Sequence, residues 1–279
     1  MWRIFFFSIV LQCIFSYDAE AQLYVGPTIG GEVSKVYFFD GYRYNDFTPR
    51  PSFGFSGGFM ASMRIHKNYV LNAQLLYSTR TKHIDPGAGY DPEFKFTSKM
   101  QFIELPIFYA LEFKSLKGDL NGRGGKIKTY NWFAGAGPIV SYWLSGKSTM
   151  QSSNLREIHI DQIDYTTIFG ADPSSGGQPI TSNKEYVSEA NRFQFGINFT
   201  GGLSFEPVGL HKIVTFVQFN FMQTFLAKSD VSLPTFDIDV LRARNHSIRL
   251  SVAYLLDTKI ETSKKGKSTK GKEVKRKRR

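Results

Sequence analysis

The chain has 279 residues, 42% of them hydrophobic and 15% aromatic, with 25 glycines and a formal net charge of +11. This length suits one or two soluble domains or a single large closed sheet, and the joint abundance of aromatic residues and glycine favours β structure. Residues 257–279 contain 11 Lys or Arg and 3 acidic residues, so the other 256 residues have a net charge of only +3. The charge therefore does not make the body of the protein a nucleic-acid binder.

Residues 1–21 have the layout of a secretory signal peptide. Arg3 precedes an apolar run from Ile4 to Phe15, and Ala19-Glu20-Ala21 forms an A-x-A cleavage site before Gln22. The apolar run has about 12 residues, which is too few for a membrane-spanning helix. We expect the mature chain to begin at Gln22 and to lack Cys13, the only cysteine. Lipidation of Cys13 is a weaker alternative, because the preceding residue is not small.

From Gln22 onward, the alternation of apolar and polar residues predicts eight β-strands. Their expected ranges are 23–38, 53–65, 69–84, 97–114, 128–149, 189–206, 212–226 and 246–256. Long polar loops follow every odd-numbered strand, at 39–52, 85–96, 150–188 and 227–245. Shorter connections follow the even-numbered strands, at 66–68, 115–126 and 207–211. An even number of strands with its long loops at one end is the layout of a bacterial outer-membrane barrel.

The segment RFQFGINFTGGLSF, residues 192–205, shows the alternation most clearly. One of its faces is rich in Phe, and the other is polar but uncharged. In a soluble lipocalin-like barrel the polar face would be solvated and rich in Lys and Glu. The polar positions carry mostly neutral side chains instead, which are Gln74, Ser78, Gln194, Asn198, Thr200, Ser204, Gln218 and Asn220. We therefore predict an all-β, eight-stranded antiparallel up-and-down transmembrane β-barrel, with both termini in the periplasm.

A length check supports membrane insertion of the fifth predicted strand. Its apolar positions carry Tyr130 and Trp132 at one end and Tyr142 at the other. Ten residues of a strand tilted by about 45° span roughly 23 Å, close to the apolar band of about 25 Å between the aromatic girdles of such barrels.

Three charged residues are expected inside the barrel. The interior of an eight-stranded barrel is just wide enough for side chains to fill, so a wide pore is not expected. The strand alternation places Arg64, Glu104 and Arg249 in this interior. Because buried charges need partners, we predict that Glu104 pairs with at least one of the arginines. The network is interpreted as a structural plug, and a gated or proton-linked path is the alternative.

Two motifs carry a family resemblance. FIELPIFYALEF (102–113) contains Ile103-Glu104-Leu105-Pro106, and WFAGAGPIVSYWLSG (132–146) contains Gly135-Ala136-Gly137-Pro138. Over residues 22–256 the chain resembles the outer-membrane β-barrel domain family of Bacteroidota, often called PorT-like. The resemblance implies a barrel and, through the founding member, a connection with type IX secretion. Because Pro106 and Pro138 lack a backbone N–H, we expect each at a bulge or another strand irregularity.

The sequence predicts no catalytic, cofactor or metal site. His83-Ile84-Asp85 and His159-Ile160-Asp161, with Asp91 and Asp164, are conceivable metal ligands, but solvated loop residues explain them better. A lipid-modifying hydrolase at the rim is a weaker alternative, because no histidine lies in the His-x-Ser arrangement that resemblance to lipid A deacylases would require.

The C-terminal segment 257–279 is expected to be a disordered periplasmic tail. One interpretation is that its basic side chains bind an anionic partner such as peptidoglycan, lipid head groups or an acidic protein, and not nucleic acid. These residues are Lys264, Lys265, Lys267, Lys270, Lys272, Lys275, Arg276, Lys277, Arg278 and Arg279. A solvated tail without a partner is the equal alternative.

Two functional hypotheses follow. The first is a non-enzymatic outer-membrane component, an accessory of protein secretion or envelope assembly, that contacts its partners through the tail and the periplasmic turns. The second is a surface binding or adhesion module that uses the loop 150–188, which is long enough to form a binding surface of its own.

Overall fold

The structure is a computed structural model. It describes residues 23–39, 47–66, 68–86, 91–114, 129–170, 183–206, 211–228, 231–232, 238–239 and 241–258. The predicted signal peptide lies outside the described residues, and so does the predicted basic tail apart from Asp257 and Thr258.

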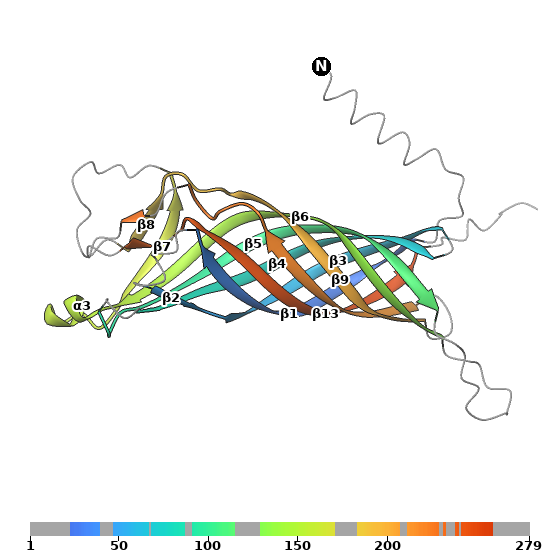
Figure 1. Cartoon of the computed structure of the whole chain (residues 1–279), viewed down its shortest axis with the longest axis horizontal. Coiled ribbons are helices and arrows are strands. Elements are labelled where there is room, and N and C mark those ends of the chain that lie inside the picture. Colours follow the sequence, from blue (N-terminus) through green and yellow to red (C-terminus); the bar gives the residue numbers. More distant parts are fainter. Residues whose placement is uncertain are drawn as a thin grey trace, which may run out of the picture.

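Eight long strands form the body of the protein (Figure 1). They are β1 (Leu23–Phe38), β3 (Ser52–His66), β4 (Tyr69–Pro86), β5 (Lys95–Lys114), β6 (Thr129–Gln151), β9 (Phe193–Glu206), β10 (His211–Met222) and β13 (Ala243–Asp257). These strands match the eight predicted ones, with small shifts at their ends. The largest shifts are at the start of β9 and the end of β10, where the sequence predicts longer strands.

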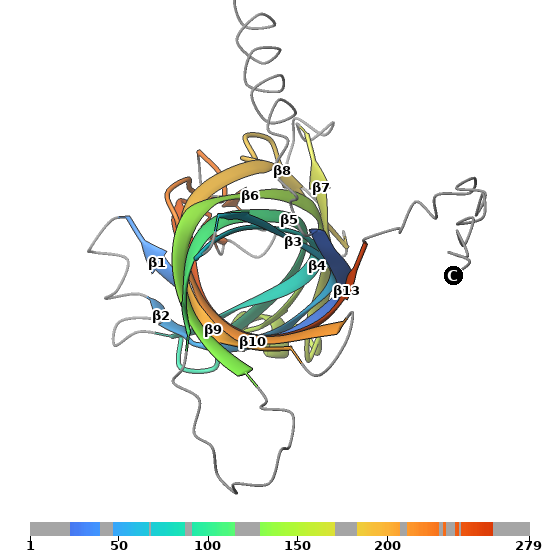
Figure 2. The same ribbon diagram turned by 90° about the vertical axis from the view of Figure 1, so that its right-hand side faces the viewer.

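The eight strands close into a ring. Each strand pairs antiparallel with the next long strand in the chain, and β1 also pairs with β13. Figure 2 shows the ring from one end. Tyr24 lies opposite Asp257, so the first and last strands meet side by side. The predicted up-and-down barrel is confirmed.

The barrel has two unlike ends. The connections β3–β4, β5–β6 and β9–β10 lie at the same end as Leu23 and Asp257, and we call it the turn end. The other end, called the loop end, carries the connections β1–β3, β4–β5, β6–β9 and β10–β13. The small elements α3, β7 and β8 gather there, as Figure 1 shows.

The outer face of the barrel is apolar. Phe53, Phe55 and Ile29 are 80%, 76% and 71% exposed, although such side chains are normally buried in a soluble protein. The Phe-rich face of β9 also points outward, with Phe193, Phe195, Ile197 and Phe199 all exposed. Aromatic pairs lie on this face, including Tyr130 stacked on Phe205 with ring centroids 4.8 Å apart. This continuous apolar exterior is typical of a barrel whose solvent is lipid.

The inner face is polar and tightly filled. All eight neutral polar residues predicted to face the interior are buried, and none is more than 4% exposed. They are Gln74, Ser78, Gln194, Asn198, Thr200, Ser204, Gln218 and Asn220. Their burial is expected because alternate residues of a strand face opposite sides of the sheet.

The loop end contains short elements that alternation did not predict. β2 (Phe47–Arg50) pairs with the end of β4, and β7 (Ile163–Phe169) pairs with the end of β6. β8 (Lys184–Val187) runs parallel to β7. Two further strands of two residues, β11 (Val231–Ser232) and β12 (Ile238–Asp239), pair with each other. Such short segments contain too little alternation for detection, and β2 and β7 are held by the ends of long strands.

A single turn of helix, α3 (Ser153–Glu157), also belongs to the region expected to be a plain loop. The side-chain oxygen of Ser152 caps it by accepting a hydrogen bond from the Leu155 N–H at 3.4 Å. No helix in the described ranges is both long and apolar enough to span a bilayer.

Both motif prolines lie where a strand ladder is interrupted, but neither lies at a register shift. The β4–β5 ladder has no paired residues at Leu105 and Pro106. The β5–β6 ladder has none at Ile107 and Phe108, which face Pro138 and Gly137. The register is the same on both sides of each gap. The β5–β6 register shift occurs elsewhere, beside Gln101. The prolines therefore cause a local strand irregularity rather than a bulge.

Candidate functional site: two ion-pair clusters in the barrel

Four charged side chains meet in the interior, and we call them the tetrad: Glu32, Arg80, Glu104 and Arg249. Glu104 accepts hydrogen bonds from Nη2 of Arg80 and from Nη2 of Arg249. Glu32 accepts from Nε of Arg80 at 3.1 Å and from Nε of Arg249 at 2.8 Å. All four side chains are 0% exposed, and each acid contacts both bases. The tetrad is a closed, electrically neutral ring of alternating charges.

The tetrad joins two pairs of neighbouring strands, and β3 lies between the two pairs. Glu32 lies on β1 and Arg249 on β13, while Arg80 and Glu104 lie on β4 and β5. Moving a charge out of water is costly, and only close opposite charges with several hydrogen bonds offset that cost. Loss of any one member would leave a net charge inside the barrel. The tetrad therefore links four strands across the interior as one unit.

Two of the three predicted interior charges belong to the tetrad. The structure brings Glu104 and Arg249 together, but it places Arg64 at the turn end, in a separate cluster. Glu32 and Arg80 were not among the candidates, although both have the inward parity of their strands. Charge balance could have revealed them, because one glutamate with two arginines leaves an uncompensated positive charge. A buried set of that composition requires another acid.

The turn end has its own ion-pair cluster around Glu112. The Lys212 ammonium lies 2.8 Å from Oε1 of Glu112, and Nη2 of Arg64 lies 3.0 Å from Oε2. Glu206 lies at the edge of this cluster, 3.5 Å from Arg64. Glu112 and Lys212 are buried, whereas the Arg64 side chain is 29% exposed. This cluster therefore forms a partly hydrated charged layer at the turn end.

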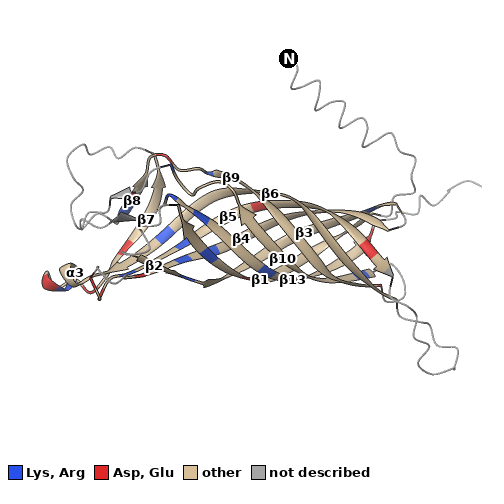
Figure 3. Cartoon of the chain, viewed as in Figure 1, with Lys and Arg blue, Asp and Glu red and all other residues tan. Residues whose placement is uncertain are grey.

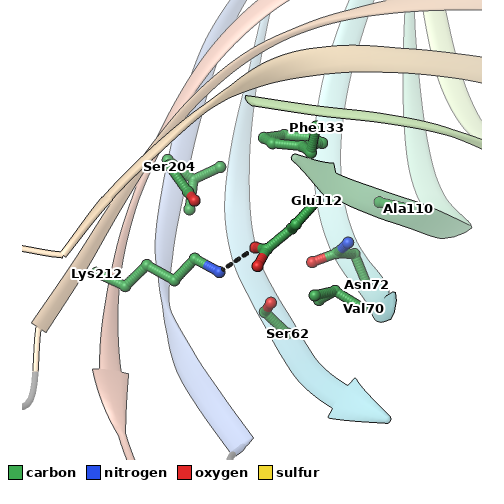
Figure 4. A pocket seen from close by; sticks show the side chains of 9 residues that line it. Ser62, Val70, Asn72, Ala110, Glu112, Phe133, Ser204 and Lys212 are labelled. Atoms are coloured by element: carbon green, nitrogen blue, oxygen red, sulfur yellow. Dashed lines mark hydrogen bonds and ion pairs between the residues drawn. The ribbon is translucent and has the colours of Figure 1, made fainter. Parts of the chain in front are cut away.

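A small cavity adjoins this cluster, as Figure 4 shows, with Glu112 and Lys212 facing each other across it. Its volume is about 10 Å³, and Ser62, Asn72 and Ser204 are among the residues that line it. A space of this size holds at most about one water molecule. It is too small for a ligand.

Apolar clusters lie on both sides of the tetrad, as the inward residues of β5 show. Ala110 and Phe108 belong to a cluster on the turn side of Glu104, together with Met60, Val214 and Leu255. Phe102 and Met100 belong to another on the loop side, with Trp143 and Leu241. The guanidinium of Arg80 lies 5.0 Å from the centre of the Phe102 ring. The interior is therefore a sequence of packed layers.

A larger hollow lies at the loop end. Its volume is about 370 Å³, and its lining is mostly polar: Pro92, Glu93, Lys95, Gln151, Ser152, Arg156 and Asp161. Arg156 donates to Oε1 of Glu93 at 2.6 Å, which ties α3 to the segment before β5.

Asp91 makes a second connection between these two segments. Its Oδ2 accepts from the Ser153 N–H at 2.6 Å and from the Ser153 hydroxyl at 2.8 Å. Partial burial raises the pKa of Asp91, but the hydrogen bonds from Ser153 and from the Glu93 N–H outweigh it and hold this pKa below its ordinary value. The ionised carboxylate of Asp91 therefore holds the start of α3 against the segment before β5.

The conceivable metal ligands do not converge. Nδ1 of His83 lies 2.8 Å from the Thr97 hydroxyl, and its Nε2 lies 3.1 Å from Asp85. Asp164 accepts a hydrogen bond from the Thr149 hydroxyl, and Asp91 accepts one from the Ser153 hydroxyl, so neither carboxylate contacts His83 in these bonds. Within the part of the chain that the structure describes, no three His, Cys, Asp or Glu side chains form a group suited to a metal.

Comparisons with known proteins concern the fold. Ail, the attachment invasion locus protein of Yersinia pestis, is 11% identical, with 85% of this chain and 100% of that chain covered and a TM-score of 0.33. Neisserial surface protein A is 12% identical, with coverages of 86% and 99% and a TM-score of 0.34. The outer membrane protease OmpT of Escherichia coli is 9% identical, with coverages of 85% and 95% and a TM-score of 0.25. At these values the similarities imply no shared activity.

No curated protein matches the sequence. A family model does match, and it covers residues 18–225, which is well over half of the chain and includes seven of the eight barrel strands in full. Its description, outer membrane protein beta-barrel domain, agrees with the closed antiparallel ring, the apolar exterior and the polar interior. This chain belongs to the outer membrane protein beta-barrel domain family and is a β-barrel protein of the bacterial outer membrane.

Proposed function

We propose that the protein is a non-enzymatic envelope component that works through the two ends of its barrel and not through the interior. The observation that carries this proposal is the neutral tetrad with apolar clusters on both sides. Its charges are neutralised by one another and are fully buried, which leaves the interior without an exposed reactive group of this kind. The layered packing also argues against passage of solutes.

The narrower role that we propose is that of an accessory in protein secretion or envelope assembly. Its support is the PorT-like resemblance, whose two motifs lie on the adjacent strands β5 and β6, with Glu104 directly opposite Ser141. In this proposal lipid surrounds the apolar exterior, and the turn end faces the periplasm with both termini. The basic residues of 259–279 would then reach an anionic periplasmic partner.

The structure indicates where to truncate the chain for a test. Thr258 still belongs to the barrel, because its N–H and hydroxyl donate to the Leu23 carbonyl at 2.8 and 2.7 Å. Deletion of 259–279 should therefore leave the barrel folded while it impairs secretion or envelope integrity in cells. Protease added to intact cells should spare the tail. Digestion of the tail from outside would reverse the proposed orientation.

The loop end supports a second candidate function, the binding of a partner at the cell surface. The observations in its favour are the extension of the barrel by β7, β8 and α3 at this end, and a polar hollow of about 370 Å³ that is lined by α3 and the segments beside it, before β5 and between β6 and β7. This volume lies within the range of small-ligand sites, although its lining is more polar than is usual for them. The hollow therefore suits a hydrophilic ligand or a polar peptide.

Variants at the hollow separate the two candidates. Arg156→Ala together with Glu93→Ala removes two lining side chains and the 2.6 Å ion pair between them. Glu157→Ala is the matched control, because Glu157 is an exposed residue of the same helix and does not line the hollow. If the surface role is right, the double variant loses adhesion and the tail deletion retains it. The reverse pattern would support the periplasmic role alone.

A further inference from the structure

Two lysines lie directly opposite each other on the outside of the barrel. Lys99 of β5 pairs in register with Lys147 of β6, and both side chains are exposed. Directly opposite residues in antiparallel strands have Cβ atoms about 4.5–5.5 Å apart, and like charges at this spacing destabilise a sheet. Neither lysine forms an ion pair with any described residue, so the repulsion between them is not compensated within the described chain.

The lysines lie beyond the apolar belt, toward the loop end. Ile103 and Tyr142 form the last pair of apolar outward positions on these strands, and Gln101 with Ser145 follows. Lys99 and Lys147 come next, four residues of β5 beyond Ile103. At about 3.3 Å per residue and a tilt of about 45°, this is roughly 9 Å above the apolar edge. The head-group region of one leaflet is about 5–8 Å thick, so the backbone of the two lysines lies at its outer edge, and their long side chains reach down into it.

The surrounding polar groups are engaged elsewhere. Below the lysines, the Ser145 hydroxyl donates to Gln101 at 2.6 Å. Above them, Thr149 donates to Asp164 at 2.8 Å. Beside the pair, Thr81 of β4 lies next to Lys99 and Thr166 of β7 next to Lys147. Two ammonium groups without ion pairs therefore lie between two threonines, and the exposed Lys184 of β8 follows Thr166 in the same row.

Figure 3 shows that the Lys and Arg positions on the strands lie mostly in the half of the barrel nearer the loop end. Several of them belong to the interior, such as Arg80 and Arg249, which the tetrad neutralises. Lys35 of β1 is outward, but it lies over the Tyr37 ring at 5.6 Å and has His246 opposite. The Lys99–Lys147 pair differs because its two charges are adjacent and have no such partner.

We propose that Lys99 and Lys147 form a binding site for the phosphate group of an anionic membrane lipid in the leaflet that borders the loop end. A phosphate monoester carries between one and two negative charges near neutral pH and offers several strong acceptor oxygens. Placed between the two ammonium groups, it replaces their repulsion with two charge-assisted hydrogen bonds. The hydroxyls of Thr81 and Thr166 lie on either side of such a group. This site does not depend on the proposed function.

The test compares the purified full chain in phosphatidylcholine bicelles with and without phosphatidic acid. Phosphatidic acid should raise the Tm of the wild type, and Lys99→Gln/Lys147→Gln should abolish that rise. Lipid titration by native mass spectrometry should show a loss of affinity of about tenfold or more, because hydrogen bonds between charged groups are among the strongest in proteins. In pure phosphatidylcholine, either single variant should melt at or above the wild-type Tm, because the repulsion is removed.

The control variant is Lys35→Gln, which removes one outward charge of the same half of the barrel and should retain the lipid effect. The proposal is overturned if the double variant keeps the rise in Tm, or if Lys35→Gln loses it equally. An equal rise with oleate would mean that any anionic surface suffices, and an equal rise with inorganic phosphate would mean a site for soluble anions. Either result would also reject the lipid-phosphate site.

Discussion

Arg249 donates a hydrogen bond from Nη2 to Glu104 across the interior, although 145 residues separate them in the sequence. The contact links the last barrel strand to β5, and Glu32 and Arg80 complete the ring of charges around it. Because all four side chains are fully buried, the stability of the barrel depends on their charge balance.

Substitution of Glu104 by Gln should lower the free energy of unfolding by about 3–5 kcal/mol, because it leaves an uncompensated positive charge in the interior. Urea unfolding in lipid vesicles, followed by tryptophan fluorescence, measures the change. Addition of Arg80→Gln restores neutrality, so the double variant should be less destabilised than the sum of the two single variants. Arg64→Gln is the control, with a loss of about 1 kcal/mol or less, because this side chain is partly exposed. If Glu104→Gln left the free energy of unfolding unchanged, the tetrad would contribute little to the stability of the barrel.

Substitution of Gly137 by Ala tests the close approach of β5 and β6 at the second motif. A Cβ added to Gly137 would lie 2.0 Å from the Ile107 carbonyl oxygen, so the backbone must shift. Overpacking of this kind costs about 1–3 kcal/mol in the free energy of unfolding. Gly31→Ala is the matched control, because a Cβ there meets nothing within 4 Å. If the two variants had equal free energies of unfolding, β5 and β6 would be able to move apart at Gly137 without loss of stability.

A charge on the apolar exterior tests its contact with lipid. Phe199 is 50% exposed, near the middle of the Phe-rich face of β9. Substitution by Arg should cost about 2–4 kcal/mol in a bilayer, since this is the penalty near the membrane midplane. Phe113→Arg, at the outward position nearest the turn end of β5, should cost only about 0–1 kcal/mol, since the penalty falls near the interfaces. Similar costs for both variants would contradict the placement of the membrane along the barrel axis.

The loop end should loosen in acid. The pKa of Asp91 is held below its ordinary value when folded, so its stabilising effect is present above the ordinary pKa of aspartate. That effect should be lost as the pH falls through the lowered pKa, because a protonated carboxyl holds the Ser153 N–H and hydroxyl less strongly. Hydrogen exchange of the Ser153 amide, measured against pH, follows this change. In Asp91→Asn the acid-induced increase should disappear, and its persistence would assign the effect to another group.

The alternation of residues determined the number, order and facing of the eight strands, because a period of two follows directly from strand geometry. It placed Gln194 and Asn198 inside and Phe195 and Phe199 outside before any tertiary contact was known. The resemblance to a family of outer-membrane barrels also came from sequence, since its motifs are local.

Only the tertiary structure decided which interior side chains meet. Contacts across the interior depend on how the strands are staggered around the ring, and one strand's sequence carries no record of that stagger. For this reason we expected from the sequence that Arg64 would lie in one interior group with Glu104. In the structure, Arg80 and Glu32 lie beside Glu104 and Arg249, and Arg64 lies at the turn end. β7 and α3 were likewise set by the end of β6 and by Asp91, partners that become neighbours only after the barrel has closed.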